Sequence, residues 1–108
     1  MLKKLLEAFT SVSGSHRTDA RYEAGRIARR CTIGLELSGD EIFRILGTRA
    51  LLIYQAADDP KAMKDDQLAS TIELLKGMAS ELAQLEASRG LRKRITEAYR
   101  AESLGRST

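Results

Sequence analysis

The sequence predicts an all-α protein folded as one compact bundle of four to five helices. Its composition is dominated by Ala, Leu, Glu, Lys and Arg, which lose little side-chain freedom in a helix. Pro occurs once in the 108 residues, and apolar residues recur every three or four positions along most of the chain. A chain of this length favours a single domain, residues 1–108, with a basic tail from about residue 104. The expected helices cover about residues 2–12, 18–33, 40–57, 66–88 and 91–103.

The first expected helix, 2–12, carries an apolar stripe at helical spacing that is made by Leu2, Leu5, Leu6, Phe9 and Val12. The polar stretch SGSHRTD that follows should end this helix. The lysines beside the stripe suit an anionic membrane surface, but Glu7 opposes one. We therefore expect the helix to dock on the protein's own core.

The second expected helix, 18–33, has one face of small apolar residues, which are Ala20, Ala24, Ile27 and Cys31. Its opposite face is basic, with Tyr22, Arg26 and Arg29, and with Arg30 beside them. This basic face is either solvated, which we favour, or a contact for phosphate and RNA bases. The letters TIGLEL then alternate as in a strand, but no second strand is evident in the sequence to pair with it. We expect the helix to end there, with a loop at Gly34.

The third expected helix begins at a capping box in the letters SGDE, residues 38–41. A broad apolar arc follows over residues 42–57, which is typical of a central helix that is covered on most sides. If this run is one helix, Arg49 lies in the apolar arc, and because an unpaired buried charge is costly it must either extend its guanidinium to solvent or find an acidic partner. Glu73 and Asp59 are the candidate partners.

A break at Gly47 and Thr48 would instead place Arg49 in the exposed first turn of a new helix. The stretch LSGDEIFRILGTRALLIY then resembles the helix-turn-helix of DNA-binding regulators, which implies that its second part would lie in the major groove. The pattern departs from that family at Thr48, where an apolar residue is usual. It departs again at Leu51 and Leu52, which offer no donors to base edges. We therefore favour one continuous or merely kinked helix.

The fourth expected helix, 66–88, has the most regular apolar stripe in the chain, made by Leu68, Ile72, Leu75, Met78, Ala79, Leu82 and Leu85. Gly90 predicts its end. The apolar positions Leu91, Ile95 and Ala98 are rotated by about half a turn from Leu82 at 3.6 residues per turn. They therefore belong to a separate last helix, 91–103, whose start carries the basic letters SRGLRKR.

The sequence offers little catalytic chemistry. It contains one histidine and one cysteine, so we expect no metal site, no cofactor and no enzyme activity. Cys31 should be a buried structural thiol of low reactivity. We identify no signal peptide and no apolar run of the roughly 20 residues that span a bilayer. These features, with the single cysteine, favour a cytoplasmic protein without a membrane span.

Charge is distributed unevenly along the chain. Residues 1–30 carry seven Lys/Arg against three Asp/Glu, residues 31–88 five against ten, and residues 89–108 six against two. Basic ends around an acidic middle suit a polyanion contact, an acidic partner, or packing of the ends on the protein's own middle. A solvated charge mix is the simplest alternative.

The sequence favours a non-enzymatic protein–protein interaction protein, an adaptor, inhibitor or assembly factor that also forms a homodimer. The expected partner or dimer face comprises Phe43, Leu51, Leu52 and Tyr54. The alternatives are a DNA-binding transcriptional regulator that uses a helix-turn-helix-like segment, 37–57, and an RNA-binding protein that uses the basic ends. The candidate contacts for a nucleic acid or another anionic partner are Arg26, Arg29, Arg30, Arg49, Arg92, Lys93 and Arg94.

Overall fold

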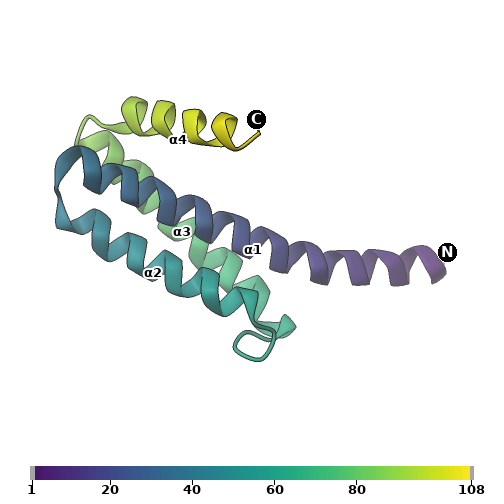
Figure 1. The fold of residues 1–108 in the computed structure, drawn as a ribbon. Coiled ribbons are helices and arrows are strands. Elements are labelled where there is room, and N and C mark those ends of the chain that lie inside the picture. Colours follow the sequence, from purple (N-terminus) through teal and green to yellow (C-terminus); the bar gives the residue numbers. More distant parts are fainter. Residues whose placement is uncertain (1, 108) are drawn as a thin grey trace.

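The computed structural model describes the backbone of residues 2–107 and the side chains of residues 16–105. Within residues 2–107 it has four helices and no strand, which are α1 (Leu2–Ser38), α2 (Glu41–Asp58), α3 (Asp65–Ser88) and α4 (Arg92–Ser107). Figure 1 shows α2 running back alongside the much longer α1, whose N-terminal end extends past the other helices. The all-α fold and the count of four to five helices are confirmed. None of the described helices is long and apolar enough to cross a membrane.

Helix α1 joins the two helices that were expected at 2–12 and 18–33, so the predicted break at SGSHRTD is wrong. That stretch contains no proline, and its one glycine, Gly14, costs a helix only about 1 kcal/mol. The predicted docking of 2–12 on the protein's own core is also wrong, because the unbroken α1 carries the backbone of these residues past the end of the other helices. The loop expected at Gly34 is also wrong, because α1 continues to Ser38. Gly34 is buried, and a Cβ added there would lie 2.7 Å from ring atoms of Phe43.

The turn between α1 and α2 starts α2 two residues later than the predicted capping box. Ser38 is the last helical residue of α1, and its hydroxyl donates to the carbonyl of Gly34 over 2.6 Å. Gly39 adopts a left-handed φ of 70°, which closes the end of α1. Asp40 is the actual N-cap of α2, and its carboxylate accepts from the backbone amide of Ile42 over 3.2 Å.

Helix α2 runs without a break through Gly47, which confirms the single-helix interpretation. Gly47 permits close helix packing rather than a turn, because a Cβ there would lie 2.9 Å from the Cβ of Cys31 on α1. The expected burial of Arg49 is wrong, since this side chain is exposed. Ile45 and Leu52, which lie one turn before and one turn after Arg49 on the same face of α2, are 50% and 60% exposed. This part of the apolar arc is therefore uncovered.

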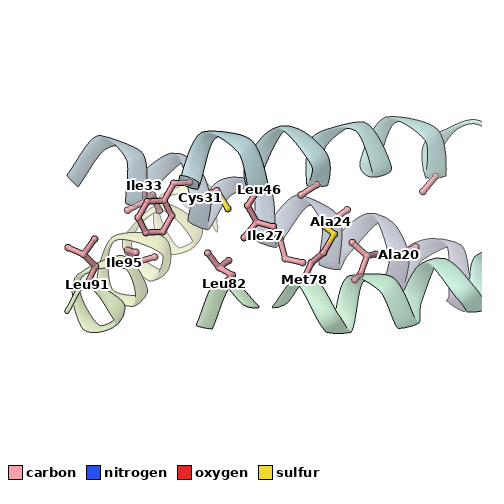
Figure 2. Close-up of a cluster of buried hydrophobic side chains, with 14 of the residues drawn as sticks. Ala20, Ala24, Ile27, Cys31, Ile33, Leu46, Met78, Leu82, Leu91 and Ile95 are labelled. Atoms are coloured by element: carbon pink, nitrogen blue, oxygen red, sulfur yellow. The ribbon is translucent and has the colours of Figure 1, made fainter. Parts of the chain in front are cut away.

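The core gathers around the second half of α1, with α2 and α3 packed along it and α4 crossing its end (Figure 2). It takes the small-residue face that was predicted for α1 and the predicted stripe of α3. Its buried members are Ala20, Ala24, Ile27, Cys31, Ile33, Phe43, Leu46, Ala50, Ala57, Leu68, Leu75, Met78, Leu82, Leu91 and Ile95. Gly90, with a φ of 67°, ends α3 as predicted and lets α4 turn back to place Leu91 and Ile95 in the core.

Candidate functional site

Four of the predicted anion contacts, Arg26, Arg29, Arg30 and Arg92, form ion pairs within the chain. Arg30 is 8% exposed and forms a two-pronged pair with Glu86, with its Nε 2.9 Å and its Nη2 2.8 Å from the carboxylate oxygens. Arg29 pairs with Glu102 on α4, and Arg26 pairs with Glu23 one turn away over 3.0 Å. Arg30 is therefore not available to an external partner in this fold, and sequence analysis missed its role because Glu86 belongs to another helix.

The basic ends of the chain pair with its acidic middle. Arg17 forms an ion pair with Asp65 over 3.0 Å and donates to main-chain oxygens around the α2–α3 loop. Arg89 pairs with Asp40 over 2.8 Å and so ties the end of α3 to the start of α2. The Arg89 guanidinium, helped by the backbone amide that Asp40 caps, holds the pKa of the Asp40 carboxyl below its ordinary value. Much of the charge asymmetry thus serves the fold.

Four of the predicted basic contacts remain at the surface: Arg49 on α2, and Arg92, Lys93 and Arg94 at the start of α4. Arg92 lies 3.7 Å from the buried carboxylate of Glu86, which adds a second cation to that pair. Arg49 forms no ion pair with any side chain in the described range 16–105, so neither Glu73 nor Asp59 is its partner as predicted.

The four residues of the predicted partner face do not share one surface. Phe43 is fully buried against α1 and cannot reach a partner in this fold. Tyr54 is half-buried beside Gly25, with the guanidinium of Arg21 5.9 Å from its ring centre. Leu51 lines a hollow between α1 and α2, whereas Leu52 lies on the α3 side of α2. The prediction that residues 42–57 form the central, mostly covered helix is wrong: α1 is the central helix, and Ile45, Leu51 and Leu52 of α2 are exposed.

The uncovered part of the arc lines a groove between α2 and α3, with a volume of about 720 Å³. We call it the α2/α3 groove; it is lined by Arg49, Leu52, Ile53, Glu73, Leu74, Gly77, Met78 and Glu81. Leu52 and Leu74 are 60% and 57% exposed on its two sides. A smaller hollow continues it along α2 and shares Arg49 and Glu81; its other lining residues are Ile42, Ile45, Leu46 and Leu85.

Of the exposed apolar residues in the groove and the smaller hollow, Leu52 belongs to the predicted partner face, whereas Ile42, Ile45 and Leu74 were not predicted as contacts. The signal was present, because Ile42, Ile45 and Leu52 occur at intervals of three and seven residues, which place them on one helical face. Ile42 and Ile45 were placed only in the broad apolar arc, because the sequence does not show where the covered part of that arc ends. The groove is apolar along its length, and its charged side chains are one arginine, Arg49, and two glutamates on α3.

A second hollow, of about 480 Å³, lies where α1 meets Tyr54 and Tyr99, and it is lined by Thr18, Arg21, Tyr22, Gly25, Arg26, Tyr54 and Tyr99. Both of its arginines already have carboxylate partners, Asp58 for Arg21 over 3.2 Å and Glu23 for Arg26. An anionic ligand would have to displace them. The apolar surface of the α2/α3 groove is exposed, so a partner can bind it without displacing an ion pair of the chain.

Among the side chains of residues 16–105, no group of three or more His, Cys, Asp and Glu residues could hold a metal ion. Cys31 is a buried free thiol, and burial together with the nearby Glu86 raises its pKa to about 12, against the opposing effect of Arg30. A thiol in this state is a poor nucleophile at neutral pH. Comparison with protein-family models, with curated proteins and with solved structures finds no match to the chain.

Proposed function

We propose that this chain is a non-enzymatic protein–protein interaction protein that forms a homodimer through the α2/α3 groove. The observation that carries the proposal is the exposure of Leu52 and Leu74, which face a common groove from two different helices. Burying exposed apolar surface is the main driving force of most protein association. Continuous apolar grooves on monomeric proteins commonly mark interaction sites. The cytoplasm suits this protein, since its one cysteine is a free thiol.

A second copy of the chain is the occupant that charge favours. The groove has an acidic excess, with Glu73 and Glu81 against Arg49. The first turns of α1 have a basic excess, Lys3 and Lys4 against Glu7, whereas the arginines of the first 30 residues pair within the chain. Complementary charge of this kind steers association and sets orientation.

The test compares two exposed leucines in the groove with one outside it. Leu52→Glu and Leu74→Glu place a charge in the groove, whereas Leu104→Glu places the same charge at a 69% exposed position on α4. All three replace exposed side chains, so thermal unfolding should show intact folding. Light scattering should show a dimer for the unmodified chain and for Leu104→Glu, and a shift to monomer for both groove variants. An unmodified chain that stays monomeric at high micromolar concentration would rule out the proposal.

Nucleic-acid binding is the second candidate, and it rests on the exposed Arg92, Lys93 and Arg94 at the start of α4. The helix-turn-helix interpretation requires a break at Gly47, whereas α2 is one helix through that residue. Anisotropy titrations with duplex DNA and with single-stranded RNA test this candidate at about 50 mM salt, where phosphate contacts are strong. Substituting Arg94 by Gln should lower the salt slope by about one unit if it contacts phosphate. No binding to either probe at that salt would remove the candidate.

A further inference from the structure

We infer that the occupant of the α2/α3 groove is the N-terminal segment of α1 from a second copy, residues 2–12, exchanged reciprocally between the two chains. This inference rests on the proposed homodimer and names the part of the chain that forms it. Each copy would then supply the helix that the other copy's groove lacks.

The first support is the course of α1. Arg17 donates to the carbonyl of Met63 in the α2–α3 loop over 2.8 Å, which places residue 17 at the end of the bundle where that loop lies. Helix α1 nevertheless begins at Leu2, so its first turns lie beyond this point, as Figure 1 shows. At 1.5 Å per residue they amount to about 22 Å of helix. Because α1 has no break, these turns cannot fold back onto the core of their own chain.

The second support is the sequence of these turns. Their apolar positions follow the spacing with which an amphipathic helix anchors itself in a groove, and they are Leu2, Leu5, Leu6, Phe9 and Val12. A helical stripe of this kind favours burial. Since the continuous α1 carries the stripe away from its own bundle, the cover must come from another molecule.

The third support is the match in shape. Helix α1 packs against one side of the α2–α3 pair. The groove between α2 and α3 opens on the side away from α1, where a further helix would complete a four-helix arrangement. The groove and the smaller hollow that continues it together run along α2 from Ile42 to Ile53, one residue step more than from Leu2 to Val12. The two stretches are about 15–17 Å long at 1.5 Å per residue. Gly77 lines the groove, and a Cβ there would meet no atom within 4 Å, so a partner helix has room to approach α3 closely.

The fourth support is charge. Residues 2–12 have a basic excess, Lys3 and Lys4 against Glu7. The groove has the opposite excess, Glu73 and Glu81 against Arg49. Glu73 already pairs with Lys76 over 3.0 Å, an exposed contact one turn along α3 that a basic partner can share.

The experiment uses full-length variants with a matched control in the same segment. Phe9→Glu puts a charge in the apolar stripe, whereas Ser11→Glu puts the same charge on the opposite side of the helix by sequence register. We expect Phe9→Glu to weaken dimerisation at least tenfold by light scattering, and Ser11→Glu to remain dimeric. A labelled peptide of residues 1–15 should bind the Phe9→Glu chain, whose groove is vacant, and should fail to bind the Phe9→Glu/Leu52→Glu double variant.

The contrary outcomes separate this inference from the proposed function. If Phe9→Glu remains a dimer while Leu52→Glu becomes a monomer, the groove is an interface but residues 2–12 do not fill it, and the inference is overturned. If the unmodified chain is a monomer, both ideas fall. If that monomer sediments with anionic phospholipid vesicles and Phe9→Glu abolishes the sedimentation, the stripe serves a membrane surface, which also overturns the inference.

Discussion

The buried pair of Arg30 and Glu86 allows a quantitative test of the fold. In the Arg30→Met variant, Glu86 keeps its place at 1% exposure but loses both guanidinium bonds, of 2.9 and 2.8 Å. The nearest remaining cation is Arg92 at 3.7 Å, and the hydroxyl of Thr96 loses its bond from Arg30 as well. Removing one member of a buried ion pair costs about 3–5 kcal/mol, because the other charge is left without compensation. That is a large part of the roughly 5–15 kcal/mol by which a typical domain is stable.

The double variant Arg30→Met/Glu86→Leu removes both charges and fills the space with apolar groups. Such replacements are commonly neutral or stabilising by about 1–4 kcal/mol, so the double variant should recover most or all of the loss. Urea unfolding followed by circular dichroism measures the three free energies of unfolding. If Arg30→Met costs less than about 1 kcal/mol, or if the double variant is no better than the single one, the packing of α3 and α4 on α1 described here is incorrect.

Three further outcomes follow from the contacts of individual residues. Gly47→Ala should lower the free energy of unfolding, because overpacking against Cys31 costs about 1–3 kcal/mol and outweighs the gain in helix propensity. Gly77→Ala, whose added Cβ meets no atom within 4 Å, should raise the free energy of unfolding of the monomer by about 1 kcal/mol. Equal effects in urea unfolding would contradict the α1–α2 packing. Asp40→Asn keeps an N-cap but loses the charge that Arg89 pairs with. The folded-state pKa of Asp40 is depressed, so its contribution is present above the unfolded pKa and lost as the pH falls through the folded one. The urea midpoints of Asp40→Asn and the unmodified chain should therefore differ at pH 7 and converge below about pH 4; a constant difference would argue against the pairing. Native labelling of Cys31 by a thiol reagent should be slow and should accelerate on unfolding, since its pKa is raised to about 12, and fast native labelling would show that the thiol is not buried.

The long periodic segments were predictable from sequence. The stripe of α3, the small-residue face of α1 and the stop at Gly90 all depend on spacing within one segment, and the structure confirms them. The glycines of α1 and α2 were harder, because their roles depend on the facing helix. Gly34 was expected in a loop but packs against the ring of Phe43, and Gly47 was a possible turn but packs against Cys31. A sequence shows that a glycine is present without showing what lies opposite it.

The candidate site was only partly predictable for the same reason. The excess of apolar surface on α2 was evident, and Leu52, which was predicted for a partner face, is exposed. Phe43 was predicted at the partner face but is buried, and the exposed Leu74 was not predicted as a contact. The spacing defines a helical face but not which neighbouring helix covers it. The exposure of Arg49 follows from this, since the apolar residues around it face an open groove rather than a packed interior. The partner of Arg30 likewise comes from a helix that is distant in sequence.

If a second copy covers the exposed apolar groove of this chain, the mass in solution must double. Sedimentation equilibrium of the unmodified chain, from low to high micromolar concentration, tests it most directly because it measures mass without assumptions about shape. A homodimer formed through the groove requires a mass that rises to twice the 11.9 kDa of one chain and no further. A mass of one chain throughout the range would contradict it.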